Sequence, residues 1–188
     1  MKKNNNDIIV NVTKSYLPPL EEYVNEISIL WENHYLTNYG QLNNKLVNNI
    51  KNYLKLDNIH YVTNGTISLQ LAINALNIES GEIITTPFTY IATLSSILWQ
   101  RCTPVFVDIN EKDFNIDVTK IEKKITTNTK AIMAVHCFGI PCNVVEIDNI
   151  AKKNNLKVIY DAAHSFGTML NNKSVLSYGD ISCCSFHA

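Results

Sequence analysis

Hydrophobic residues recur with helical spacing in the first part of the chain. Between Leu20 and about His34 they form one stripe, made of Leu20, Tyr23, Val24, Ile27, Leu30 and Trp31. After the turn residues Leu36–Gly40, a second stripe consists of Leu42, Leu46, Val47, Ile50 and Leu54. The spacing predicts two amphipathic helices, and we interpret the stripe of the first helix as a packing face.

From Ile59 onward the pattern changes to short apolar runs that are bounded by turn or cap residues and separated by helical stretches. The runs predict strands at Ile59–Thr63, Glu82–Thr85, Pro104–Asp108, Ala131–Cys137, Lys157–Tyr160 and Ile181–Phe186. The intervening stretches predict helices at about Ile67–Leu76, Ile91–Gln100, Val118–Ile125 and Val144–Asn154. This alternation is typical of an α/β domain with a mostly parallel sheet.

Composition and charge narrow the class of protein. The chain has 188 residues, of which 46% are hydrophobic and 18% charged, with a formal net charge of -1. These values suit one globular domain behind a polar, Asn-rich arm at Met1–Lys14. The interspersed charges favour a small-molecule ligand over nucleic acid or a membrane surface. No apolar run is long enough to span a bilayer and no secretory signal is apparent, so we expect a cytoplasmic protein.

The cysteines indicate neither disulfides nor a metal site. There are five, at Cys102, Cys137, Cys142, Cys183 and Cys184. Their number is odd, and a chain with this much apolar material folds without covalent links, so we expect reduced thiols. The neighbouring histidines and cysteines do not form two short ligand pairs at a workable distance, as a zinc site would require.

Candidate chemistry begins where the predicted strand Lys157–Tyr160 ends. Asp161 follows that strand directly, and His164 lies three places further on. Ligands of open parallel sheets bind outside the carboxyl ends of the strands, so a carboxylate and an imidazole at this point suggest a site. Each residue also has a structural explanation, because Asp161 is able to cap a short helix and His164 to be a hydrogen-bonded core histidine.

Two further segments fall at the same predicted edge. Asn64-Gly65-Thr66 precedes a helix, where glycine lets a ligand approach and free amide groups favour a phosphate. Tyr90 follows the second predicted strand and offers a flat ring for stacking on a planar ligand. The structural alternatives are that Thr66 is only an N-cap and that Tyr90 packs under a helix start.

Taken together, these groups predict a site for a planar, phosphorylated cofactor. A phosphate cradle, a flat aromatic ring, a carboxylate and an imidazole would meet at one sheet edge. Pyridoxal 5'-phosphate fits this set best, because a buried aspartate keeps the pyridine nitrogen protonated and so makes the ring an electron sink.

Several motifs resemble the nucleotide-sugar aminotransferases of the DegT/DnrJ/EryC1/StrS group, from about Leu17 to Ala188. The matching segments are Asn64–Thr66, Thr86–Thr93, Pro104–Asp108, Asp113–Asp117, Val135–Gly139 with Pro141, Asp161–His164, Gly179–Ile181 and Ser185–Ala188. Their order and spacing make the resemblance specific. Tyr16–Leu20 and Leu36–Asn38 further resemble the branch that acts on thymidine-diphosphate 4-keto-6-deoxy sugars.

The resemblance implies a fold-type I major domain of three α/β/α layers and a role for each site residue. Gly65, Thr66 and Ser185 would hold the cofactor phosphate, and Tyr90 would stack on the pyridine ring. Asp161 would pair with the ring nitrogen, and His164 would approach the ring hydroxyl. Such enzymes are homodimers that take an amino group from L-glutamate, through pyridoxal and pyridoxamine phosphate, to a ketosugar used in polysaccharide or antibiotic synthesis.

The resemblance also places the lysine that binds the cofactor covalently two positions after Ala188, where the sequence stops. We therefore expect a partial major domain, without the small C-terminal domain, that does not turn over as given because no residue takes the lysine's role. Two alternatives stay open. One is a binding module that retains pyridoxamine phosphate or a sugar nucleotide without catalysis, and the other is part of a family sugar dehydratase, which has histidine at the lysine position.

Overall fold

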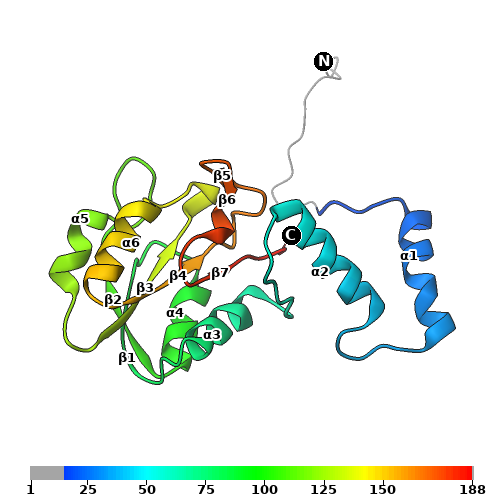
Figure 1. The fold of residues 1–188 in the computed structure, drawn as a ribbon, viewed down its shortest axis with the longest axis horizontal. Helices are drawn as coiled ribbons and strands as arrows, with labels where there is room; N and C mark the ends of the chain where they lie inside the picture. The colour runs from blue at the N-terminus through cyan, green and yellow to red at the C-terminus, as the bar shows by residue number, and fades with distance from the viewer. Residues whose placement is uncertain (1–14, 188) are drawn as a thin grey trace, which may run out of the picture. The chain divides into compact units, whose positions relative to one another are not determined.

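The computed structural model describes residues 15–187 (Figure 1). Their contacts form two units, one made of the described residues up to Lys45 with His187, the other of Leu46–Phe186. The predicted arm Met1–Lys14 lies outside the described residues. In the part of the chain that is described, no helix combines the length and apolar character needed to cross a membrane.

The first unit contains the predicted amphipathic helices. Helix α1 (Leu20–Asn33) begins directly after Pro19, and α2 (Gln41–Leu54) starts in this unit and continues into the second. An ion pair of 2.6 Å joins Lys45 Nζ to Glu26 Oε2 and links the two helices. Both helices confirm the prediction. Among the described residues, nothing buries the apolar stripe of α1: the helix has no buried residue, and Trp31 is 70% exposed.

The second unit is a parallel sheet between helices. Its strands are β1 (Gly81–Thr85), β2 (Cys102–Phe106), β3 (Thr129–Val135), β4 (Lys157–Asp161) and β7 (Ile181–Cys183), in the order β2-β1-β3-β4-β7. Helices α5 (Val118–Ile121) and α6 (Val144–Lys153) cover one face, while α3 (Gly65–Ala75) and α4 (Ile91–Trp99) cover the other (Figure 1). The predicted three-layer α/β architecture is confirmed.

One predicted strand and several predicted boundaries are wrong. The segment Ile59–Thr63, predicted as a strand, is irregular, and the last strand ends at Cys183 instead of Phe186. A strand needs a neighbour for its backbone groups, and the described residues pair with β7 only along its β4 side. The predicted helix Val118–Ile125 is α-helical only in α5, and a 3-10 turn follows at Glu122–Lys124. The two-residue strands β5 (Met169–Leu170) and β6 (Lys173–Ser174) are too short to show a period.

The sheet has a hydrophobic core on each face, because successive side chains of a strand point in opposite directions. Ile132 and Val158 belong to the cluster that α6 covers. Met133 and Ile159 belong to the cluster that α3 and α4 cover. Strand order and alternation therefore decide on which side of the sheet each residue near the strand ends will lie.

His136 and Tyr160 share the α6 side at the carboxyl end of the sheet. Their rings stack at 4.5 Å, and both side chains are fully buried. The Cys142 backbone amide donates to His136 Nδ1 at 3.0 Å. Burial lowers the pKa of His136 to about 4 and raises the pKa of Tyr160. His136 is therefore neutral near pH 7 and holds the segment that leads into α6.

Neutral His136 predicts a specific dependence of stability on pH. Its pKa falls from 6.5 in the unfolded chain to about 4 in the folded state, so the unfolded chain binds more protons between these values. This contribution to stability is present near pH 7 and is lost as the pH falls toward 4. Urea denaturation at pH 7 and at about pH 4.5 measures this effect. Over that range the free energy of unfolding of wild type should fall by about 2 kcal/mol more than that of His136→Gln. Equal losses in the two proteins would contradict a buried neutral histidine.

Candidate functional site

The carboxyl ends of β1, β3 and β4 border a cavity of about 260 Å³. The residues that line it lie at or just after the ends of these strands: Pro87, Phe88, Thr89 and Tyr90 after β1, Val135, Cys137 and Phe138 at β3, and Asp161, Ala163 and His164 at β4. Three of the six predicted site residues, Tyr90, Asp161 and His164, are therefore brought together. The edge of the sheet predicted from the sequence is the edge that carries the cavity.

Asp161 is the last residue of β4 and is only 6% exposed. Its Oδ2 accepts a hydrogen bond of 2.6 Å from Thr93 Oγ1, and its Oδ1 accepts one of 3.2 Å from the Ala163 amide. Thr93 Oγ1 also lies 2.7 Å from Thr89 Oγ1. The capping alternative for Asp161 describes only the Ala163 bond, because the carboxylate is anchored to α4 as well.

Tyr90 and His164 are both exposed, which makes their structural alternatives wrong. Tyr90 is the residue before α4, is 75% exposed and caps nothing with its side chain. The His164 ring stacks on Phe138 with centroids 6.2 Å apart. The buried histidine of this region is His136, on the opposite side of the sheet.

Gly65, Thr66 and Ser185 form a second group at the same edge. Helix α3 begins at Gly65, and its N-cap is Asn64, whose Oδ1 accepts from the Ile67 amide at 2.9 Å. Thr66 is thus inside the first turn and is not the cap.

Ser185 reaches this group from the end of the sheet. A Cβ added to Gly65 would lie 3.4 Å from Ser185 Cβ, so the two residues are in contact. Ser185 follows β7, in which Cys183 pairs with Asp161. The helix start and Ser185 therefore lie near Asp161 without lining the cavity itself.

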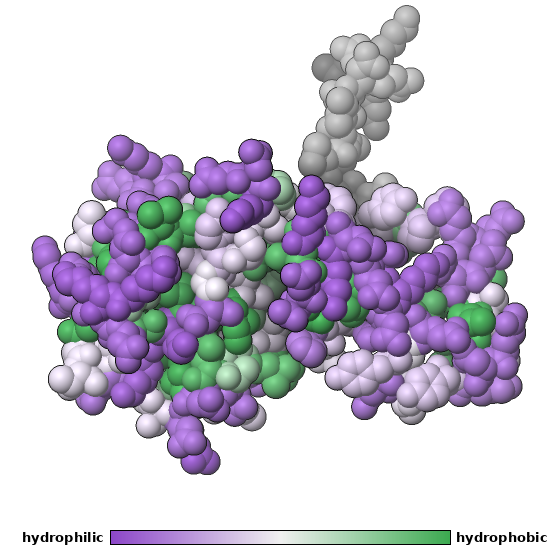
Figure 2. Space-filling model, in the orientation of Figure 1, coloured by the Kyte–Doolittle hydropathy of each residue, from purple (hydrophilic) through white to green (hydrophobic). Residues whose placement is uncertain are grey.

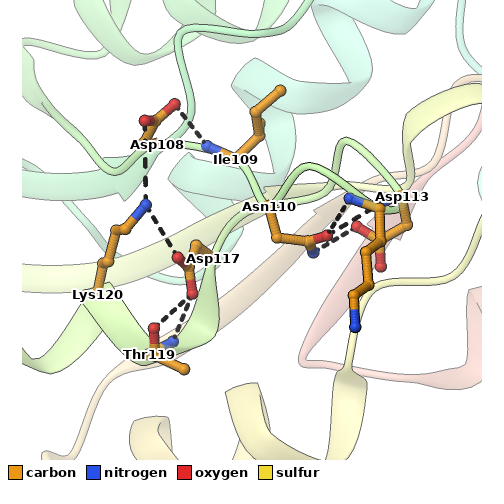
Figure 3. Close-up of polar contacts among 8 residues, drawn as sticks. Asp108, Ile109, Asn110, Asp113, Asp117, Thr119 and Lys120 are labelled. Atoms are coloured by element: carbon orange, nitrogen blue, oxygen red, sulfur yellow. Dashed lines mark hydrogen bonds and ion pairs between the residues drawn. The ribbon is translucent and has the colours of Figure 1, made fainter.

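The loop between β2 and α5 does not line the cavity but contacts residues that do, through Phe114 and Asn115. Figure 3 shows Asn110 turned toward Asp113, with the Lys112 and Asp113 amides donating to Asn110 Oδ1. At the base of the loop, Lys120 Nζ lies 3.0 Å from Asp117 Oδ2. The hydrogen bond from the Thr119 hydroxyl, with further help from Lys120, lowers the pKa of Asp117.

Asn115 fastens this loop to the next one. It is 2% exposed, and its Oδ1 accepts from the Cys137 amide at 2.9 Å. Its Nδ2 donates to the carbonyl oxygens of Ile140 and Pro141 at 3.2 and 3.3 Å. One buried side chain therefore satisfies three backbone groups of the segment that carries Phe138.

The two loops and the segment after β1 bring three aromatic rings together. Phe88 stacks on Phe114 at 5.7 Å, and Phe138 meets both rings edge-on. Phe114 and Phe138 have φ angles of 61° and 52°, which are unfavourable for side chains with a Cβ. Gly139, at φ 80°, lets the second loop approach the His164 carbonyl. The packing of the loops thus holds an exposed aromatic rim in place against local backbone preference.

The sequence predictions did not include Phe114, Phe138, Thr89 and Thr93 among the site residues. Phe114 and Phe138 each occur in a polar or glycine-containing segment shortly after a strand, and that position is the signal available in the sequence. Thr93 carries no such signal, because it lies inside α4 and its distance from Asp161 depends on the tertiary structure.

The five cysteines are all free in the structure, and four of them are buried. Burial raises the pKa of Cys183 to about 11. Among residues 15–187 there is no group of three or more His, Cys, Asp or Glu side chains that is arranged to hold a metal ion.

Solved structures share this fold. DesI, crystallised in the presence of its TDP-sugar product, superposes with a TM-score of 0.86 at 27% identity, over 90% of this chain and 43% of that chain. NtdA from Bacillus subtilis with bound cofactor PMP gives a TM-score of 0.79 at 27% identity, over 92% and 41%. The domain has the α/β architecture of fold-type I transferases.

The sequence comparison identifies the family. Residues 20–188 match the DegT/DnrJ/EryC1/StrS aminotransferase family, and the chain belongs to it. The dTDP-4-amino-4,6-dideoxy-D-glucose transaminase of Shigella dysenteriae is 48% identical over 177 residues, which cover 94% of this chain and 48% of the relative. The chain thus spans about half the length of the curated relatives that it matches.

Replacing the buried Asn115 should destabilise the protein far more than replacing an exposed asparagine. Asn115→Ala leaves the buried Cys137 amide and the Ile140 and Pro141 carbonyls without their partner, at a cost of about 2 kcal/mol or more. Asn52→Ala, an exposed substitution in α2, should stay within about 0.5 kcal/mol of wild type. Denaturant unfolding of both variants measures the difference, and similar midpoints would refute the role of Asn115.

Proposed function

We propose that this chain forms the cofactor-binding domain of an enzyme that transfers an amino group from L-glutamate to a dTDP-4-keto-6-deoxy sugar with the help of pyridoxal and pyridoxamine phosphate. The observation that carries the proposal is the buried carboxylate of Asp161 at the cavity, held by Thr93 and by the Ala163 amide. When bound, such a cofactor supplies an electron-withdrawing pyridine ring. The family membership supports the same reaction class.

The residues around the cavity fit the ring of the cofactor. A carboxylate has about four lone-pair positions, and the hydrogen bonds from Thr93 and Ala163 to Asp161 leave lone pairs for a protonated ring nitrogen. The exposed ring of Tyr90 has a face available for stacking on a flat ligand. His164, held against Phe138, would donate to or accept from a ring hydroxyl.

The second group of residues fits the phosphate. Helix α3 has eleven residues, and the Gly65 and Thr66 amides precede both the Ile67 amide, which donates to the Asn64 side chain, and the first intrahelical bond, from Ser68 to Asn64. Such amides and the helix dipole favour an anion. The contact between Gly65 and Ser185 would place a hydroxyl beside Thr66, so that backbone and side-chain donors converge on the phosphate.

The names of relatives support the proposed substrate. The Shigella dysenteriae relative is named as a dTDP-4-amino-4,6-dideoxy-D-glucose transaminase, and DesI was crystallised with a TDP-sugar product. A nucleotide sugar would enter over the aromatic rim of Phe88, Phe114 and Phe138, whose rings suit the apolar face of a deoxy sugar.

An apolar surface favours a homodimer. Leu71, Ile91, Leu98 and Trp99 on α3 and α4 are each at least half exposed. Figure 2 shows hydrophobic side chains gathered on the surface of this part of the second unit. Contiguous apolar surface of this kind marks an interaction site, and a second copy of the chain would bury it.

Binding of pyridoxamine phosphate tests the proposed cofactor directly, because this form carries an amine and needs no covalent bond to the protein. Calorimetry should show binding to wild type, weakened at least about tenfold in Asp161→Asn, whose amide would present a donor to the ring N–H. Asp148→Asn, on the exposed side of α6 and paired with Lys152, is the matched control and should bind like wild type. Absence of binding to wild type, or equal binding by Asp161→Asn, would refute the cofactor site.

The dimer proposal predicts an effect of charge on the α3–α4 surface. Leu71→Glu combined with Leu98→Glu should convert a dimer into a monomer, because carboxylates would be buried at the contact. Val145 is exposed on α6, on the other face of the sheet, and Val145→Glu should leave the protein a dimer. Analytical ultracentrifugation measures both, and a monomeric wild type would argue against the interface.

A further inference from the structure

The hydrogen bond between Thr93 and Asp161 joins two elements that are far apart in the sequence. The residues are separated by 68 positions, both are buried, and their oxygens lie 2.6 Å apart. Asp161 ends β4, and Thr93 lies in the first turn of α4. The contact is therefore a product of the fold and acts on the carboxylate proposed to meet the cofactor.

The direction of this hydrogen bond follows from the chemistry of the groups. An ionised carboxylate only accepts, so the single hydroxyl hydrogen of Thr93 is donated to Asp161. Thr93 has no second hydrogen, so in the 2.7 Å contact with Thr89 the hydrogen comes from Thr89. The hydroxyl chain runs from Thr89 through Thr93 to Asp161.

The chain leaves a defined set of free positions at the cavity. Thr93 donates to Oδ2 of Asp161 and the Ala163 amide donates to Oδ1, so the two hydrogen bonds fix the rotation of the carboxylate group. Thr89, which lines the cavity, has given its hydrogen to Thr93 and presents only lone pairs. Both Asp161 and Thr89 would thus offer acceptors to a ligand that carries donors, such as a protonated pyridine nitrogen.

We propose that Thr93 is a positioning residue for the cofactor ring, which it serves by orienting the Asp161 carboxylate, and that Thr89 extends the same hydroxyl chain to the cavity. This inference rests on the proposed cofactor site. A carboxylate held by two donors keeps its remaining lone pairs in one direction, so a ring nitrogen meets an acceptor that is already in place.

A purely structural role for Thr93 makes a different prediction. If the bond only ties α4 to β4, removing it lowers stability and leaves ligand binding unchanged. A matched structural control exists on the same helix, because Ser96 is also buried and its hydroxyl donates to the Thr93 carbonyl at 2.8 Å without touching Asp161. Ser96→Ala should destabilise the protein without changing its affinity for pyridoxamine phosphate.

The test compares Thr93→Val, which keeps the shape of the side chain and removes the donor, with Thr93→Ser, which keeps the hydroxyl. By calorimetry, Thr93→Val should bind pyridoxamine phosphate about tenfold more weakly than wild type, and Thr93→Ser within about twofold. Binding of inorganic phosphate should be equal in all three proteins, because the helix start at Gly65 and Thr66 is unchanged.

A spectroscopic readout separates positioning from folding. The absorption of bound pyridoxamine phosphate depends on whether the ring nitrogen carries a proton. In a pH titration the spectrum of the protonated ring should persist to higher pH in wild type and Thr93→Ser than in Thr93→Val. If circular dichroism shows that Thr93→Val is unfolded, Thr89→Val breaks the hydroxyl chain one step earlier and should weaken binding by about threefold.

The outcomes distinguish this inference from the cofactor proposal on which it rests. If wild type does not bind pyridoxamine phosphate, both are overturned. If wild type binds and Thr93→Val matches it in affinity and spectrum, only the positioning role is overturned. Equal weakening by Thr93→Ser and Thr93→Val, or an equal loss of inorganic phosphate binding, would also overturn it, because neither effect would come from the hydroxyl.

Discussion

The pairing of β4 between β3 and β7 is the constraint on which the candidate site depends. It makes Asp161 the end of a strand that is hydrogen-bonded on both sides, with Val135 and Cys183 as its register partners. Because side chains alternate along a strand, Tyr160 then points toward α6 and Asp161 toward α4. A shift of one residue would exchange these positions and remove the carboxylate from the cavity.

Buried polar groups anchor the loops at this edge. Asn115 satisfies three backbone groups of the loop after β3, and His136 accepts from the Cys142 amide on the other side of the sheet. These bonds allow Phe114 and Phe138 to keep left-handed backbone angles. Polar anchoring and the mutual packing of the rings together hold the exposed aromatic rim in place.

The pattern of the chain predicts most of the fold because each element carries its own period. Five of the six predicted strands and all of the predicted helices occur, with shifted ends. Ile59–Thr63 has the composition of a strand and fails because no described neighbour pairs with it. Among the site residues, Tyr90, Asp161 and His164 meet at the cavity, whereas Gly65, Thr66 and Ser185 form the adjacent group at the start of α3.

The sequence by itself determined the α/β class, the edge of the sheet that carries the cavity and the family resemblance, because periodicity, strand-end chemistry and motif order are local properties. Only the tertiary structure decided that Thr93 anchors Asp161, that Asn115 fastens two loops and that His136 is the buried histidine instead of His164. These contacts join residues distant in the sequence, so their partners depend on strand order and side-chain direction. No local pattern contains that information.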